Sequence, residues 1–377
     1  MSVIKVNKIE STGTTAGGVE VDSSGHVQVD GVQMPTTGAL SNRNLVINGG
    51  MTVSQRGTSF SFAHDGTTAA YNVDQMHFTL ANLESFDCTV SQSTDAPAGF
   101  SNSWKLTTGT AETSIDANDL AYFQTVIEAQ NLQQLNYGSS GAQTITLSFY
   151  VKSSVTGTFG CTVYQAAGVR NRTATYTINT ANTWERKEIT LTGDTAGTIN
   201  NNNGIGFNVA WNLAAGSDWD ATDSTSWGAY VASRWAYGHA QDGVITTAGA
   251  TWQITGMQLE VGEKATPFEH RSYGDELASC MRYFHTANWQ YCWLLNGVTY
   301  RAIAPGPSIP MRTTPDVSYF HPSTGTANQA RQHSSGTAHT INDVGNASDA
   351  YGPSTYFGMS STPTYPVTVK TQYDAEL

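Results

Sequence analysis

The chain has 377 residues, enough for two or three domains of ordinary size. Its 30 acidic and 18 basic residues leave a net charge of -12 without any run of Lys and Arg, which argues against nucleic acid or an anionic membrane surface as a partner. Only 13% of the residues are charged, about half of the usual quarter, so we expect a neutral, polar surface rich in Ser, Thr and Asn.

Neither a targeting signal nor a membrane span is expected. The N-terminal sequence MSVIKVNKIESTG contains no apolar segment and no cleavage site, and no window of about 18 consecutive apolar residues occurs. We therefore expect synthesis in a cytoplasm and no membrane insertion.

The cysteine and histidine patterns predict no metal and no cofactor. Four cysteines lack C-x-x-C spacing and accompany no signal peptide, which favours free, mostly buried thiols: Cys88, Cys161, Cys280 and Cys292. Nine scattered histidines form no H-E-x-x-H or paired Cys/His pattern.

Residues 1–43 are predicted to be an N-terminal attachment segment with a β-hairpin and a linker. In VEVDSSGHVQVDG, Val19 and Val21 mirror Val27 and Val29 around a Ser-Ser-Gly turn. An isolated hairpin is marginally stable in water. Because this one has few apolar residues, we expect it to gain order by packing against other chains or a larger body.

Residues 44–272 are predicted to form a β-sandwich of the jelly-roll kind. TITLSFYVK places Ile145, Leu147, Phe149 and Val151 on one side of a strand, and GIGFNVAWNL repeats this alternation. Many short strands of this kind, separated by turn signals, are typical of a sandwich. In TWQITGMQLEVG the alternation slips by one residue beside Gly256, which predicts a β-bulge.

A connecting helix is predicted at residues 273–285, after the hinge-like stretch PFEHRSY. Its apolar residues lie at i, i+3, i+4 and i+7, and Asp275 is placed to cap its start; the stripe consists of Leu277, Cys280, Met281 and Phe284. Alternating segments then resume, so residues 286–377 are predicted to be a C-terminal β domain. The fold class is therefore all-β with one short helix.

The chain resembles bacteriophage tail-fibre and related virion-surface proteins, most closely those of marine phages that infect cyanobacteria. The resemblance lies in NLVINGGMTVSQRGTSF, in WQITGMQLEVGEKATPFEHRSYGDELASCMRYF and in IPMRTTPDVSYF, and it covers roughly residues 43–60 and 140–320. It implies a jelly roll like that of a carbohydrate-binding module, closed by the QLEVG strand and followed by the short helix and a β domain. The first 43 residues do not look like the long N-terminal adaptor of some phage tail fibres, so attachment to the tail or to the capsid is left open.

The same resemblance implies a setting and partners. It implies a homotrimeric fibre or knob on the phage tail or capsid surface, made in the host cytoplasm, bound to other virion proteins and contacting host surface glycans. The apolar stripe of the helix would then meet its copies around a threefold axis. The alternative is that the stripe packs against its own chain, as amphipathic helices commonly do.

The segment WNLAAGSDWDATDSTSWGAYVASRWAYGH supplies the candidate glycan site. Aromatic rings stack on sugars, and nearby amides and carboxylates fix the hydroxyl groups. The predicted residues are Trp219, Trp227, Tyr230, Trp235 and Tyr237. The alternative is that these rings plug the end of the sandwich or a subunit contact. Asp218, Asp220 and Asp223 lack the spacing of a calcium loop and are predicted to be a solvated acidic loop.

Catalysis finds little support in the sequence. There is no G-x-S-x-G, no G-x-x-x-x-G-K-[ST] and no G-x-G-x-x-G motif, so we predict that the chain is not an enzyme. Two alternatives to a receptor-binding virion protein are kept. One is a virion component without a ligand, and the other is a polysaccharide-degrading depolymerase, although no repeat period of the kind such enzymes carry is present.

Overall fold

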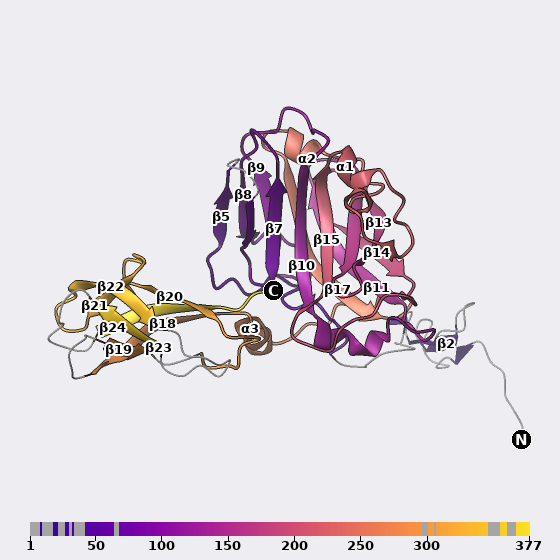
Figure 1. The fold of residues 1–377 in the computed structure, drawn as a ribbon. Coiled ribbons are helices and arrows are strands. Elements are labelled where there is room, and N and C mark those ends of the chain that lie inside the picture. Colours follow the sequence, from indigo (N-terminus) through magenta and orange to yellow (C-terminus); the bar gives the residue numbers. More distant parts are fainter. Residues whose placement is uncertain are drawn as a thin grey trace, which may run out of the picture. The chain divides into compact units, whose positions relative to one another are not determined.

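The computed structural model describes residues 8–9, 18–21, 27–29, 32–33, 42–63, 68–295, 301–304, 307–345, 355–359 and 367–377. The chain divides into two compact units. The first comprises Met1–Thr52, Thr58–Asn72 and Met76–Arg271, and the second comprises Val53–Gly57, Val73–Gln75 and Ser272–Leu377. In the described residues every strand pairing is antiparallel and helices are few and short, so the predicted all-β fold is confirmed (Figure 1).

The N-terminal segment forms a small sheet in the order β1-β2-β3-β4. Its strands are β1 (Lys8–Ile9), β2 (Val19–Val21), β3 (Val27–Val29) and β4 (Val32–Gln33). Val19 pairs with Val29 and Val21 with Val27, which confirms the mirrored hairpin register. The predicted turn at 22–26 and most of the predicted linker lie outside the described residues.

Two antiparallel sheets form the sandwich of the first unit. The seven-stranded sheet has the order β16 (Gly228–Ala229), β13 (Arg170–Ile178), β12 (Gly157–Gln165), β15 (Ile205–Ala215), β10 (Leu120–Glu128), β7 (Met76–Ala81) and β6 (Thr68–Tyr71). The six-stranded sheet has the order β14 (Glu185–Leu191), β11 (Ile145–Ser153), β17 (Thr251–Val261), β9 (Ser103–Thr108), β8 (Cys88–Ser93) and β5 (Ser59–Phe62). Figure 1 shows β7, β10 and β15 side by side in one layer.

Short helices sit in the connections of this unit. They are η1 (Ala129–Leu135), α1 (Ser217–Asp220), η2 (Ala232–Arg234) and α2 (Gly243–Thr246). Each is one or two turns long, so the sheets rather than the helices carry the fold.

Aromatic side chains from both sheets interlock in the core. The ring centroids of Trp104 and Phe123 lie 4.6 Å apart, and those of Phe149 and Trp211 lie 5.5 Å apart. Each pair joins one sheet to the other, because β9 and β11 belong to the six-stranded sheet and β10 and β15 to the seven-stranded one. Burying one Phe side chain contributes roughly 1.5–3 kcal/mol. Since Phe149 points inward, its neighbours on β11 face outward.

The predicted bulge beside Gly256 is confirmed. On β11, Ser148 pairs with Gln258 and Tyr150 with Thr255, so two residues of β17 oppose Phe149 alone. Gly256 has a φ of 62°, the left-handed region that favours glycine. The bulge keeps the apolar residues on both sides of it directed into the core.

Free thiols are found where the structure describes them. Cys88, Cys161 and Cys280 are unpaired and buried, as predicted. The side chain of Cys292 lies outside the described part, so its predicted state is not addressed.

The second unit contains a seven-stranded sheet. Its strands follow the order β18 (Phe284–Leu295), β19 (Arg301–Ala304), β23 (Thr355–Met359), β22 (Ala338–Gly345), β21 (Gln329–Gln332), β24 (Val367–Asp374) and β20 (Asp316–Phe320). β18 also pairs with β24, so six of the strands close on themselves. A small core contains Tyr319, Ala330, Ile341, Met359, Val367 and Val369.

Helix α3 (Tyr273–Met281) begins this unit, and Ser272 rather than Asp275 caps it. The Asp275 backbone N–H donates to Ser272 Oγ at 3.2 Å, and the Ser272 hydroxyl donates to the Asp275 carboxylate at 2.6 Å. The prediction of Asp275 as the cap is therefore corrected. Ser272 takes the cap position because its extended backbone precedes the first helical residue, and Asp275 supports it from the third helical position.

The apolar stripe of the predicted helix is divided between buried and half-buried side chains. Cys280 is 0% exposed and Phe284 is 3% exposed, and the Arg56 guanidinium lies 3.5 Å from the centre of the Phe284 ring. Leu277 and Met281 are half-buried. Cys280 and Phe284 are thus buried within their own chain, as the intrachain alternative expects, and a trimer seam at this helix stays a prediction.

We expect Gly256→Ala to destabilise the first unit more than Gly249→Ala does. Both glycines have positive φ, 62° and 76°, so alanine costs about 1–2 kcal/mol of backbone strain at either position. A Cβ on Gly249 meets nothing within 4 Å, whereas one on Gly256 would lie 2.7 Å from Phe100 Cζ and 3.0 Å from Tyr150 Cδ2. Overpacking should add about 1–3 kcal/mol at Gly256. Urea unfolding of both variants checks this, and equal losses would contradict it.

Candidate functional site

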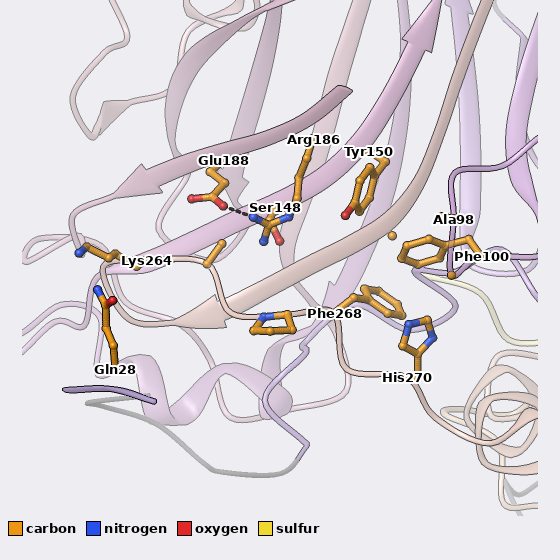
Figure 2. A pocket seen from close by; sticks show the side chains of 14 residues that line it. Gln28, Ala98, Phe100, Ser148, Tyr150, Arg186, Glu188, Lys264, Phe268 and His270 are labelled. Carbon is orange, nitrogen blue, oxygen red and sulfur yellow. Dashed lines mark hydrogen bonds and ion pairs between the residues drawn. The ribbon is translucent and has the colours of Figure 1, made fainter. Parts of the chain in front are cut away.

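A pocket of about 630 Å³ lies on the outer face of the six-stranded sheet. Ligand sites commonly have volumes of roughly 300–1,000 Å³. Strands β11, β14 and β17 supply its floor, and the residues that follow β17 supply a wall (Figure 2). Its lining comprises Gln28, Ala98, Gly99, Phe100, Ser148, Tyr150, Arg186, Glu188, Gly256, Lys264, Ala265, Pro267, Phe268 and His270.

Four aromatic rings gather at one end of the pocket. The centroid of Phe100 lies 5.4 Å from that of Tyr150, 5.0 Å from that of Phe268 and 5.3 Å from that of His270. Phe268 and His270 are themselves 4.8 Å apart. His270 is exposed and the other three are half-buried, so the cluster keeps ring surface open to a ligand.

The bulge brings two of these rings onto the backbone of β17. Tyr150 faces outward because it alternates with the inward Phe149 on β11. At Gly256 the missing side chain leaves space that Phe100 and Tyr150 fill, since a Cβ there would lie within 3.0 Å of both rings. The floor under the aromatic end is therefore main chain.

The hinge-like stretch after β17 is the wall of the pocket. Its residues alternate, with Phe268 and His270 lining the pocket and Glu269 and Arg271 bonded to Asn44. The Asn44 backbone N–H donates to Glu269 Oε2 at 3.0 Å, and the Arg271 guanidinium donates to the Asn44 carbonyl. The alternation thus gives the stretch one side that lines the pocket and one side that is hydrogen-bonded to Asn44.

Buried polar groups hold this wall to the sheet. The Thr266 hydroxyl donates to Glu260 Oε2 at 2.7 Å, and the Thr266 backbone N–H donates to Glu260 Oε1 at 2.8 Å. Arg43 Nε lies 3.6 Å from the same carboxylate, and the Glu269 backbone N–H donates to Gln258 Oε1 at 2.8 Å. Glu260 is only 2% exposed, and such a buried charge is tolerated because it is paired and hydrogen-bonded.

A second anchor holds the loop that carries Phe100. Asp95 accepts hydrogen bonds from Lys152 Nζ at 2.7 Å, Trp184 Nε1 at 3.2 Å and Gln253 Nε2 at 3.2 Å. The Lys152 ammonium, through its hydrogen bond, holds the pKa of the Asp95 carboxyl below its usual value. These bonds tie the start of the loop to the outer face of the sheet, and Phe100 follows five residues later.

The other end of the pocket carries charged side chains. Arg186 donates to Glu188 and, through Nη2, to the Thr266 carbonyl at 3.2 Å. The side chains of Arg186 and Glu188 are 34% and 45% exposed, and Lys264 is exposed in the wall. Figure 2 shows these groups on the opposite side of the pocket from the four rings. The site therefore combines ring faces with donors and acceptors of hydrogen bonds.

The aromatic segment predicted as the glycan site is a separate region over the seven-stranded sheet. Trp235 is 7% exposed, and its ring centre lies 5.1 Å from that of Tyr122, 6.2 Å from that of Tyr164 and 6.1 Å from that of Tyr230. Trp219 and Tyr230 pack against this cluster and are half-buried. Trp235 is covered on its faces, which agrees with the plug alternative for that residue.

The remaining predicted glycan residues lie outside this cluster. The Trp227 indole N–H donates to the Thr192 carbonyl at 2.7 Å, and its ring stacks on Phe207 with centroids 6.3 Å apart. Tyr237 is half-buried two residues beyond Trp235. The structure therefore brings Trp219, Tyr230 and Trp235 together but leaves Trp227 elsewhere. Binding of sugar by the half-buried rings stays a prediction.

The acidic residues of this segment form no metal site. Asp218 and Asp220 belong to α1, and Asp223 Oδ1 accepts hydrogen bonds from the Thr225 backbone N–H and hydroxyl, both at 2.8 Å. Within the described ranges, no three His, Cys, Asp or Glu side chains are grouped to hold a metal ion. Nor does any helix in those ranges have the length and apolar character to cross a membrane.

Comparison with known proteins yields structural likenesses alone. No protein-family model and no curated protein sequence matches the chain. The enzymatically active domain of tailspike protein 4 from bacteriophage CBA120 is similar at 13% identity over 58% of this chain and 21% of that chain, with a TM-score of 0.30. The family 11 carbohydrate-binding module of Clostridium thermocellum, in complex with a mixed-linked tetrasaccharide, is similar at 9% identity over 58% and 95%, with a TM-score of 0.25.

A third solved structure, the carbohydrate-binding module TmCBM61 in complex with β-1,4-galactotriose, has 10% identity over 59% of this chain and 100% of that chain, with a TM-score of 0.26. All three TM-scores are below 0.5, and such likenesses are no basis for assigning a function. The strand pairings within the chain define the fold.

Replacing Trp235 by Ala is expected to lower the free energy of unfolding by about 3–5 kcal/mol, the usual cost of deleting a buried Trp. Trp219→Ala, at a half-buried ring of the same cluster, should cost less than half as much. Denaturation followed by circular dichroism measures both variants. An unchanged free energy of unfolding for Trp235→Ala would show that the ring is not a plug. Weaker glycan binding by Trp219→Ala, with little loss of stability, would support the glycan site that the sequence predicts in this segment.

Proposed function

We propose that this chain is a non-catalytic glycan-binding protein of a phage particle, with the aromatic pocket as its binding site. The main observation behind this proposal is that four rings lie at one end of an open pocket, whereas charged and hydroxyl groups lie at the other end. A sugar ring has an apolar face that stacks on aromatic rings and hydroxyl groups that need donors and acceptors. Both requirements are met by residues whose positions are fixed by buried anchors.

The particle setting rests on the resemblance of the sequence to virion-surface fibre proteins. In that setting the chain is a homotrimeric fibre or knob on the tail or capsid surface, attached to other virion proteins, and its pocket contacts host surface glycans during adsorption. The exposed Val19, Val21 and Val27 of the N-terminal sheet are consistent with packing against another body. A virion component without a ligand is the first alternative.

A depolymerase is the second alternative, and the pocket chemistry disfavours it. Glycosidases use two carboxyl groups on either side of the scissile bond, about 5–10 Å apart. Among the described residues that line the pocket, Glu188 is the one carboxylate, and it is paired with Arg186. A single paired carboxylate supplies neither the second acid nor a free base.

The first test is Phe268→Ala assayed on a glycan array. We expect the unchanged chain to bind a glycan, and the variant to lose about 1–3 kcal/mol of binding free energy with little change in unfolding, because Phe268 is a half-buried ring in the pocket wall. Tyr273→Ala, at a residue 61% exposed in α3, is the matched control and should bind normally. No binding of any glycan, or equal binding by Phe268→Ala, would refute the proposal. Release of new reducing ends from a bound polysaccharide would instead indicate an enzyme.

The trimer is tested separately by sedimentation of the full chain at micromolar concentration, where we expect the mass of three chains. Met281→Asp, at a half-buried position of α3, should dissociate the trimer if the helix forms the seam. Glu276 on the same helix is buried and is left unchanged. A monomeric unchanged chain would contradict the assembly, and an intact trimer carrying Met281→Asp would remove the helix from the seam.

A further inference from the structure

We infer that the pocket selects an acidic oligosaccharide, with a neutral sugar on the four rings and a carboxylate or phosphate at Arg186 and Lys264. This rests on the proposed function and adds the chemical class of the ligand and its direction in the site. The basis is the separation of the lining into two ends of different chemistry (Figure 2).

The pocket has room for more than one sugar unit, and its two ends differ in chemistry. Phe100, Tyr150, Phe268 and His270 occupy one end, whereas Arg186, Glu188 and Lys264 occupy the other. Sites of this volume, about 630 Å³, ordinarily hold drug-sized molecules, which are larger than a single hexose. One sugar on the rings therefore leaves the charged end for a second unit or its substituent.

The charge at this end is opposite to that of the chain as a whole. Of the described residues that line the pocket, Arg186 and Lys264 are cations and Glu188 is an anion, whereas the whole chain has 30 acidic and 18 basic residues. Two carboxylates behind the wall already accept hydrogen bonds, Glu260 from Thr266 and Glu269 from Asn44. A net positive lining in an acidic protein favours an anionic ligand group at that position.

Arg186 is the group best suited to receive the anion. A guanidinium binds carboxylate and phosphate through two parallel hydrogen bonds. The Thr266 carbonyl, 3.2 Å from Nη2, orients the guanidinium, and its ion pair with Glu188 is exposed at 34% and 45%. Exposed ion pairs contribute about 0–1 kcal/mol, so a ligand oxyanion can replace Glu188 at small cost. Lys264 on the wall adds a second positive charge to the same end.

The test uses the full chain on an array of matched pairs that each contain a neutral sugar: sialyl-oligosaccharides and neutral oligosaccharides ending in one glucuronate beside their methyl esters, and oligomannosides with one terminal 6-phosphate beside the unphosphorylated forms. We expect at least one acidic member to bind tenfold or more tightly than its neutral partner. Increasing salt should reduce that preference, because exposed charges are screened over about 10 Å at 0.1 M. The carboxylate and phosphate arms identify which oxyanion is taken.

Calorimetric titration then uses the acidic and neutral partners that differ most in affinity, and it tests which part of the ligand binds at each end of the pocket. Lys264→Gln should weaken the acidic ligand about five- to tenfold and leave its neutral partner unchanged, whereas Phe268→Ala should weaken both. Lys370→Gln, which removes one positive charge from β24 in the other unit, is the control and should change neither. Any shift common to Lys264→Gln and Lys370→Gln is an effect of net charge alone.

The outcomes separate this inference from the proposed function. Neutral members bound as tightly as acidic ones, or equal weakening of both by Lys264→Gln, would overturn the acidic class while leaving glycan binding intact. A chain that binds no member of the array would overturn both.

Discussion

The pocket depends on one backbone position in the middle of the six-stranded sheet. Gly256, at φ 62°, forms a bulge that changes the alternation of β17 by one residue. On its N-terminal side Trp252 and Ile254 point into the core, and beyond it Met257 and Leu259 do the same. The bulge therefore lets the apolar residues before and after it face the same core although their alternation differs by one residue. Because Gly256 has no side chain, main chain alone lies beneath Phe100 and Tyr150.

The same phase change determines where the wall of the pocket is anchored. Because Met257 and Leu259 face inward, Gln258 and Glu260 face outward from β17. Glu260 accepts a hydrogen bond from the Thr266 backbone N–H, and Gln258 accepts one from the Glu269 backbone N–H. These contacts are hydrogen bonds between buried groups, so loss of one partner leaves an unsatisfied group that costs about 1–3 kcal/mol. Pocket shape and sandwich stability are thus supported by the same residues.

Local patterns predicted the elements well, since alternation and turn residues act over a few positions. The mirrored valines of the hairpin, the inward phase of Phe149 and the bulge beside Gly256 all follow from spacing along one or two strands. The residues of the pocket do not share such a signal. Phe100, Tyr150 and Phe268 are far apart in the chain and meet only because β9, β11 and β17 are neighbours in the sheet.

Two features of the sequence were informative but ambiguous. A dense aromatic segment is consistent with a sugar site and with a cover over a sheet, and only the fold shows that Trp235 is buried, which favours the cover for that residue. Likewise, the stripe of α3 specifies an apolar face without specifying what covers it, and Phe284 is covered by Arg56. The outward phase of Tyr150 in TITLSFYVK and the alternation from Phe268 to Arg271 can be seen in the sequence, but neither was interpreted as part of a site.

A crystal structure of the chain with the tightest-binding oligosaccharide would show directly where sugar binds. We expect a sugar ring against Phe100 and Phe268, above the main chain of Gly256, with the rest of the ligand directed toward Arg186. Sugar bound instead over the seven-stranded sheet, against Trp219 and Tyr230, with the pocket empty, would contradict it.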